Sequence, residues 1–182
     1  MKLVDKLVTI SKNPLSPKND FLAKGIPILV FFFLFPVLFF IIPNFVLDTW
    51  LNLPVLFSST TRILLGSILI FQGIYFLLWT LKAQKDIGKG TPMPLMATQK
   101  LVIQEPYSFT RNPLAFGLIN FYFGVSIAIG SISSLVIILF FSTVILVYIK
   151  FIEEKELAQR YGEEYIAYKR ITPFLLPRGN KK

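Results

Sequence analysis

The stretch EPYSFTRNPLAFG, residues 105–117, concentrates polar and conformationally restricted residues in an otherwise apolar chain. Arg111 and Asn112 stand there, with two prolines nearby, at the entrance of a long hydrophobic run. A helix N-terminus offers unpaired N–H groups and partial positive charge, so a helix that begins here can hold a carboxylate. Proline in the first turn loses no needed hydrogen bond. Arg111 either adds a fixed charge to such a site or reaches toward lipid phosphate.

A second candidate group lies near the C-terminus, where a helical pattern continues from the apolar run. Ile149, Glu153, Leu157 and Tyr161 are spaced four apart and share one side of a helix. Glu153 falls on this apolar side, so we expect it to be paired or functional, as inward ionisable groups at a membrane boundary usually are. Tyr165 and Tyr168 continue this side of the helix only if the helix runs past Gly162, a residue that can interrupt it.

The remaining glutamates of the C-terminal segment have a simpler interpretation. Their positions predict solvated side chains for Glu154, Glu156, Glu163 and Glu164, with Glu156 and Arg160 forming an ordinary surface pair across one helical turn.

The amino-acid composition restricts the chemistry. The chain has no cysteine and no histidine, which removes thiolate nucleophiles and the commonest metal ligand, and we expect no metal site. Carboxylates, amides, hydroxyls, lysine, arginine or a bound cofactor must carry any reaction.

Long apolar runs must position these residues. With 54% apolar residues and 19 phenylalanines among 182, the chain has more hydrophobic surface than one small soluble core can bury. A helix needs about 20 apolar residues to cross a bilayer. We predict an all-α integral membrane protein with about four transmembrane helices: 21–42, 63–81, and a C-terminal helical hairpin within 114–148 that turns at 130–134. Pro36 should kink the first helix, and residues 43–59 should form an interfacial loop.

The distribution of basic residues predicts the orientation. All of them except Arg62 fall before the first span or in its first turn, between the second and third spans, or after the last. Cytoplasmic segments collect Lys and Arg, so both the N- and C-termini should be cytoplasmic. Topology and contact with anionic membrane lipids account for the net charge of +9, and no nucleic acid partner is needed.

We treat residues 1–182 as a single membrane domain. Residues 1–81 form an N-terminal region with two spans, and residues 82–182 hold the cofactor-binding region, the hairpin and a cytoplasmic amphipathic C-terminal helix. If the hairpin is antiparallel, Arg111 and Asn112 at its start must lie beside residues 150–154 at its end.

Two motifs carry a resemblance to a known family. LVIQEPYSFTRNPLAFG, residues 101–117, resembles the signature of the isoprenylcysteine carboxyl methyltransferase family, including its bacterial relatives with an Arg-Asn-Pro motif. EEKELAQRYGEEYIAYKRITPFLLP, residues 153–177, is similar to the closing segment of that family, and GKGTPMP at 88–94 also has counterparts there. Together the motifs cover about residues 85–177.

The resemblance implies an integral membrane methyltransferase that uses S-adenosylmethionine without a Rossmann domain. The sequence has no GxGxxG motif of the kind found in Rossmann domains, which agrees with this. It assigns Glu153 to the substrate side, and with Arg111 we take it as a catalytic candidate. The family's substrate-side arginine corresponds to Ile149, with Lys150 the nearest base. The implied cofactor contacts are Gln99, Lys100, Leu101, Val102, Tyr107, Asn112, Pro113, Leu114 and Ala115.

Three positions depart from the family pattern: Glu105 replaces a glycine, Asn112 the motif histidine, and Ala115 a tyrosine. They put the identity of the acceptor in doubt. We expect methyl transfer from S-adenosylmethionine to a lipophilic small-molecule or lipidated substrate at the cytoplasmic membrane face, with a carboxylate as one candidate acceptor. Two alternatives remain: an NADPH-dependent sterol-type membrane reductase and a non-catalytic membrane scaffold.

Overall fold

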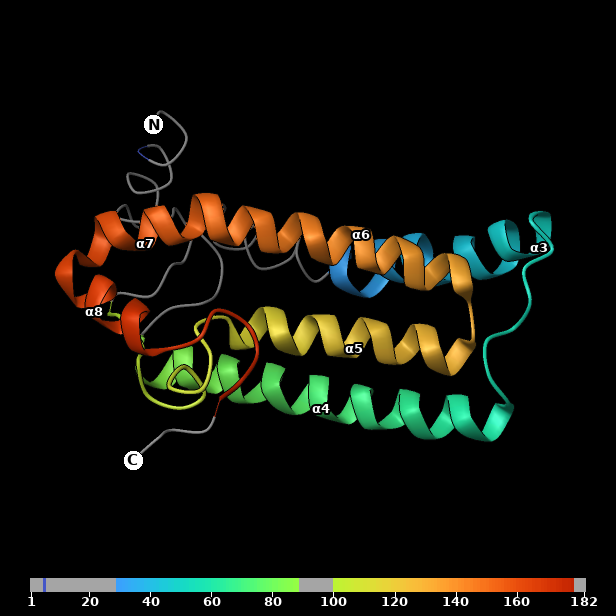
Figure 1. The fold of residues 1–182 in the computed structure, drawn as a ribbon, viewed down its shortest axis with the longest axis horizontal. Coiled ribbons are helices and arrows are strands. Elements are labelled where there is room, and N and C mark those ends of the chain that lie inside the picture. The colour runs from blue at the N-terminus through green and yellow to red at the C-terminus, as the bar shows by residue number, and fades with distance from the viewer. Residues whose placement is uncertain (1–4, 6–28, 89–99, 179–182) are drawn as a thin grey trace. The chain divides into compact units, whose positions relative to one another are not determined.

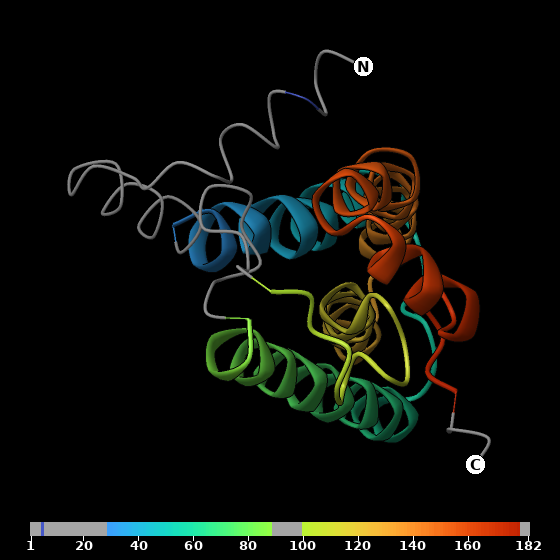
Figure 2. The same cartoon turned by 90° about the vertical axis from the view of Figure 1, so that its left-hand side faces the viewer.

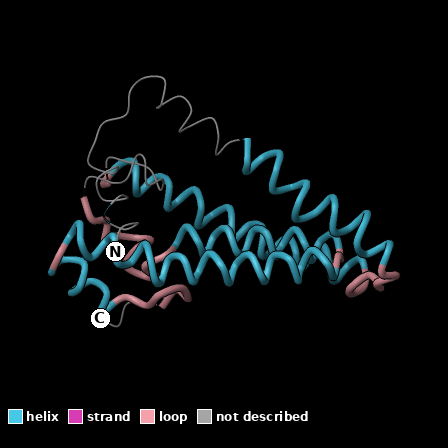
Figure 3. The backbone as a smooth tube through the Cα atoms, turned by 90° about the horizontal axis from the view of Figure 1, so that it is seen from above, coloured by secondary structure: helices cyan, strands magenta, loops and turns pink. Residues whose placement is uncertain are grey.

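The structure is a computed structural model that describes residues 5, 29–88 and 100–178. Its described part is helical and contains no strand, which confirms the predicted all-α class (Figure 3). Four segments are π-helical: η1 (Val30–Leu34), η2 (Val37–Ile41), η3 (Pro43–Leu47) and η5 (Ile149–Glu153). The α-helices are α3 (Asp48–Trp50), α4 (Ser59–Asp86), α5 (Pro113–Ile129), α6 (Ile132–Tyr148), α7 (Glu154–Tyr161) and α8 (Glu163–Ile171).

Two helices are long and apolar enough to cross a membrane, namely Ser59–Asp86 and the continuous helix Ile132–Tyr161 that joins α6 to α7. Only 17% of the most apolar part of each is buried, so their hydrophobic side chains face outward. The helix α5 is apolar but has 17 residues, a length of about 26 Å. The described residues therefore contain two candidate spans, and the four-span topology stays a prediction.

The chain divides into two compact units. Of the described residues, the hairpin unit contains 29–74 and 118–144, and the motif unit contains 5, 75–88, 100–117 and 145–178. The helices α4 and α5 and the α6–η5 helix contribute residues to both. The sequence-based division after Leu81 stays a prediction.

The hairpin unit contains the tight turn that the sequence predicts. The helix α5 ends at Ile129, and α6 begins at Ile132 and runs back beside it (Figure 1). Gly130 adopts φ 83°, a conformation that glycine reaches without strain. Arg62 donates from Nη1 to the carbonyl of Ile129 at 2.8 Å, and Asp48 accepts the N–H of Ser133 at 2.9 Å. Both ends of the turn are thus capped by charged side chains.

Two glycines allow helices of the hairpin unit to approach closely. A Cβ at Gly66 would lie 2.7 Å from Cβ of Ala128, and one at Gly124 would lie 2.7 Å from the backbone nitrogen of Ile70. Neither position has room for a larger side chain. The helices α4 and α5 are therefore held in contact at small residues, the usual arrangement where helices pack in lipid.

An aromatic cluster forms the core of the same unit. Phe39 and Tyr122 are buried with ring centroids 5.5 Å apart, and Phe141 packs on Phe39 at 4.7 Å. Phe35 contacts all three rings. The phenylalanine-rich composition thus supplies internal packing as well as outward surface.

The expectation of a loop over residues 43–59 is wrong for its first half. The chain is helical without a break from residue 29 to Trp50, and only residues 51–58 are irregular. Pro36 and Pro43 lie at the junctions between successive π-helical segments. Because proline has no N–H to donate, a wider hydrogen-bonding pattern lets the helix continue past each one. Residues 21–28 of the expected first span lie outside the described residues.

Candidate functional site

The polar site lies in the motif unit, where the segment before α5 meets the C-terminal helices. The loop from Lys100 to Asn112 runs beside the C-terminal segment (Figure 2). The backbone N–H of Arg111 donates to the carbonyl of Pro173 at 2.9 Å, and that of Arg178 donates to the carbonyl of Phe109 at 2.9 Å. Two segments about sixty residues apart in sequence are thereby joined.

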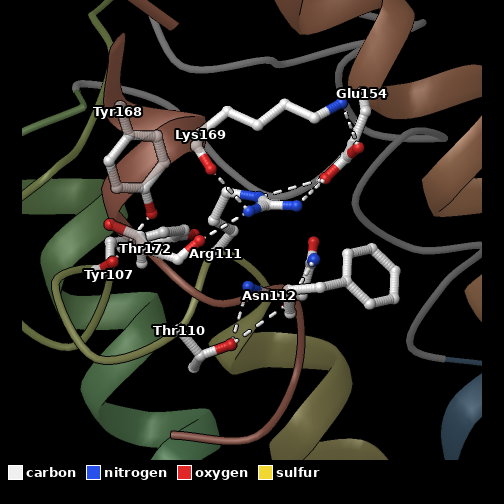
Figure 4. Close-up of polar contacts among 9 residues, drawn as sticks. Tyr107, Thr110, Arg111, Asn112, Glu154, Tyr168, Lys169 and Thr172 are labelled. Atoms are coloured by element: carbon white, nitrogen blue, oxygen red, sulfur yellow. Dashed lines mark hydrogen bonds and ion pairs between the residues drawn. The ribbon is translucent and has the colours of Figure 1, made fainter. Parts of the chain in front are cut away.

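Arg111 is at the centre of the contact (Figure 4). Its Nη2 lies 2.7 Å from Oε1 of Glu154, and its Nε lies 3.1 Å from the same oxygen. Its Nη1 donates to the carbonyls of Lys169 at 3.0 Å and Thr172 at 2.5 Å. These contacts use four of the five N–H groups of the guanidinium. They confirm that the start of α5 lies beside residues 150–154, and the lipid-phosphate interpretation of Arg111 is wrong.

Glu154 is buried and ionised, so the expectation that it is solvated is wrong. Its side chain is 2% exposed, and its Oε2 lies 2.7 Å from Nζ of Lys169. Burial acts to raise the pKa of Glu154, but hydrogen bonds from Lys169 and Arg111 outweigh it and hold the pKa below its ordinary value. A carboxylate with two cationic partners can remain charged in a buried position.

Glu153 has a different environment one residue earlier. Its side chain is half-buried, and no hydrogen bond or ion pair joins it to another residue in the described part of the chain. It lies beyond the charge-free helix α6, which ends at Tyr148. Burial raises the pKa of Glu153 to about 7, and the carboxylates of Glu156 and Glu154 add smaller contributions. Such a group changes protonation near neutral pH.

The other glutamates divide into two kinds. Glu163 and Glu164 are exposed, as expected. Glu156 does pair with Arg160, at 3.0 Å, but both side chains are largely buried, 8% and 11% exposed, so the surface interpretation is wrong. Gly162 ends α7 with φ 57°, which places Tyr165 and Tyr168 on α8 instead of on a continuation of α7.

Asn112 lies at the start of α5, where the sequence places it. Its Nδ2 donates to the carbonyl of Phe174 at 2.7 Å, and its backbone N–H donates to Oγ1 of Thr110 at 3.2 Å. Its own carbonyl accepts the N–H of Phe116 at 3.0 Å, which begins the helix. The segment after α8 therefore lies against the helix start that the sequence identifies as an anion site.

Tyr107 connects the loop to two helices. Its hydroxyl accepts a hydrogen bond from Nε2 of Gln84 on α4, and its carbonyl accepts the hydroxyl proton of Tyr168 on α8 at 2.7 Å. Burial raises the pKa of Tyr107 well above its ordinary value, so the phenol stays protonated. Gln84 and Tyr168 thus fix the residue that the resemblance assigns to the cofactor.

The remaining predicted cofactor contacts lie around this loop. Val102, Pro113 and Ala115 are buried, Leu101 and Leu114 are half-buried, and Lys100 is exposed. Gln99 lies outside the described residues.

Sequence reasoning missed three contributors to the site: Lys169, Gln84 and the carbonyls of residues 172–174. Lys169 gave no signal, because a lysine beside Arg170 on a polar helix is usually solvated. Gln84 stands between Lys82 and Lys85 and is equally inconspicuous. Backbone carbonyls have no sequence signature at all.

The geometry supplies a helix start, a half-buried carboxyl group whose pKa is raised to about 7, and a buried ion network formed by Arg111, Glu154 and Lys169. No group of metal-ligating side chains occurs in the described residues. Long outward-facing apolar helices joined to such a polar cluster are typical of a membrane protein.

The phospholipid methyltransferase family model matches residues 61–164, more than half of the chain. The chain therefore belongs to the phospholipid methyltransferase family, which indicates a membrane methyltransferase. The matched region contains α4, both helices of the hairpin and most of the site. The comparison with curated proteins gave no significant match.

Proposed function

We propose that the protein transfers a methyl group from S-adenosylmethionine to a lipophilic acceptor at the cytoplasmic face of a membrane. The observation that supports this most is the contact between Arg111 and Glu154, which joins the two motifs of the site within the family-matched region. The sulfonium is an activated methyl donor, so the protein has mainly to align it with a nucleophile and exclude water.

The start of α5 would hold the charged amino-acid end of the cofactor. Asn112 presents an amide, and the N-terminus of a 17-residue helix favours a carboxylate. Leu101, Val102, Pro113, Leu114 and Ala115 would supply apolar contact, with Gln99, Lys100 and Tyr107 completing the set. These residues suit S-adenosylmethionine because they combine uncharged polar groups and aromatic rings with a helix start and a carboxyl group.

Glu153 would act on the acceptor side. With a pKa raised to about 7, it can take a proton from an acceptor that must lose one before it attacks, and it can also attract a cation. A carboxylate acceptor would need no base, whereas an amine in a lipid headgroup would. The family description names phospholipids, so we extend a lipid acceptor to this chain and test both chemistries.

Arg111 is a positioning residue in this proposal. Four of its N–H groups are committed to Glu154 and to the carbonyls of Lys169 and Thr172, so it acts by holding the C-terminal segment beside the helix start. Its effect on the reaction then passes through Asn112 and Glu153.

Binding measurements on the full-length protein in detergent test the proposal. Wild-type protein should bind S-adenosylmethionine and transfer its labelled methyl group to a lipid extract, and Asn112→Leu should reduce binding at least tenfold. Failure of the wild type to bind would overturn the proposal. Uptake of NADPH instead would favour a reductase, and uptake of neither would favour a scaffold.

A matched control separates direct contact from docking of the C-terminal segment. Thr110 also donates to the carbonyl of Phe174, at 3.3 Å, and accepts the backbone N–H of Asn112, so Thr110→Val removes a bond to the same carbonyl while every side chain of the predicted cofactor contacts stays in place. We expect Thr110→Val to bind nearly as well as wild type. Equal losses of S-adenosylmethionine affinity in Asn112→Leu and Thr110→Val would show that Asn112 acts only by holding the C-terminal segment.

A further inference from the structure

One face of α4 in the motif unit buries polar side chains. Thr80 is 0% exposed and Gln84 is 8% exposed, and a spacing of four places them on the same side of the helix. Lys82 and Lys85 between and beyond them are exposed. Hydroxyl and amide groups are therefore turned inward on a helix whose outward face carries its charges.

In the described part of the chain, several polar atoms of this region have no hydrogen-bond partner. They are Oγ1 of Thr80, Oε1 of Gln84 and Oγ of Ser108. Buried polar atoms are paired in the great majority of cases, because an unpaired one loses its bonds to water without replacement. Three such atoms on α4 and in the turn that contains Tyr107 are candidates for hydrogen bonds to a bound ligand.

Contacts around Tyr107 bring these atoms into one neighbourhood. Gln84 donates to the hydroxyl of Tyr107, and Ser108 follows Tyr107 in the same turn. Trp79, which precedes Thr80, packs on Phe109 with ring centroids 5.9 Å apart. Residues 103–105, just before the turn, are exposed, so the turn lies at the surface.

We propose that Thr80, Gln84 and Ser108 bind the nucleoside part of S-adenosylmethionine. An amide can accept from the exocyclic amine of adenine and donate to a ring nitrogen, a pairing that glutamine makes readily. The bond to Tyr107 uses one N–H of Gln84, which leaves the second N–H and Oε1 for the base. The hydroxyls of Thr80 and Ser108 match the ribose hydroxyls, and the rings of Trp79 and Phe109 suit contact with a purine.

The polarity of the group favours the nucleoside over the amino-acid part. Thr80, Gln84 and Ser108 are all uncharged, whereas the ammonium and carboxylate of the cofactor call for charged partners or a helix terminus. The start of α5 offers such a helix terminus. This inference rests on the proposed function. It places the nucleoside of the cofactor against α4 and the amino-acid part at the start of α5.

Two ligands separate the parts of the cofactor in an experiment. Equilibrium binding of S-adenosylmethionine and of 5′-methylthioadenosine, which keeps the nucleoside but lacks the amino acid, is measured on full-length protein in detergent. Gln84→Leu should weaken both ligands about tenfold or more. Asn112→Leu should weaken S-adenosylmethionine much more than 5′-methylthioadenosine.

Gln72 provides the matched control. It lies on the same helix with an exposed side chain, and Gln72→Leu should leave both affinities unchanged. Thr80→Val tests the site without disturbing the fold, because the hydroxyl that it removes has no hydrogen-bond partner in the described part of the chain. We expect this variant to melt no lower than wild type and to bind both ligands about threefold to tenfold more weakly.

The outcomes distinguish this inference from the proposed function. If wild type binds S-adenosylmethionine but Gln84→Leu and Thr80→Val bind both ligands unchanged, the nucleoside site is wrong and the proposed function stands. If wild type binds neither ligand, the proposed function fails first. Loss of S-adenosylmethionine binding alone in Gln84→Leu would also overturn the assignment to the nucleoside.

Discussion

The two units of the molecule bury different kinds of side chain. The hairpin unit buries aromatic rings such as Phe39 and Tyr122 and joins its helices at glycines. The motif unit buries the charged side chains of Arg111 and Glu154. Apolar packing stabilises a fold without selecting a ligand, whereas a buried ion network must be satisfied in one arrangement. The contrast is between apolar packing in one unit and a buried ion network in the other.

The largest expected effect comes from breaking the ion network of the motif unit. Arg111→Met leaves Glu154 with Lys169 alone in a buried position, and loss of one partner of a buried pair costs about 3–5 kcal/mol. The melting temperature in detergent should fall sharply. The double variant Arg111→Met with Glu154→Met should recover part of the loss, and a double variant no more stable than the single one would count against the pair.

The glycine contact of the hairpin unit should respond through packing alone. A Cβ at Gly66 meets Ala128 at 2.7 Å and a backbone carbonyl at 2.8 Å, so Gly66→Val should destabilise the protein by about 1–3 kcal/mol. Ile68→Val on the same helix, 63% exposed, should have almost no effect. Thermal unfolding measures both. Equal stability of Gly66→Val and wild type would show that the helices can separate.

The smallest expected effect sharpens the role of Glu153. Because burial raises its pKa to about 7, the group is protonated below that pH and charged above it. If the acceptor must give up a proton, the methyl transfer rate should rise about tenfold per pH unit below 7 and level off above. Glu153→Gln should be slower and lack this inflection. A wild-type rate with no inflection near pH 7 would remove Glu153 as the base.

The sequence predicts the helices and the turn well because charge-free runs and the Gly130–Ser134 interruption are local signals. It also predicts that Arg111 faces the C-terminal segment, since an antiparallel hairpin requires it. It does not distinguish Glu153 from Glu154, because neighbouring residues on a helix point about 100° apart and the partners of Glu154, Arg111 and Lys169, come from distant segments. Helix continuation through Pro43 depends likewise on a hydrogen-bonding pattern that composition does not reveal.

The most direct test of the central claim is to locate the cofactor on the chain. Labelled S-adenosylmethionine is cross-linked to the wild-type protein by ultraviolet light, and the labelled peptides are identified by mass spectrometry. We predict label within residues 75–117 and 145–178, removed by excess S-adenosylhomocysteine. Competable label confined to residues 29–74 or 118–144, or no competable label at all, would contradict a cofactor site in the motif unit.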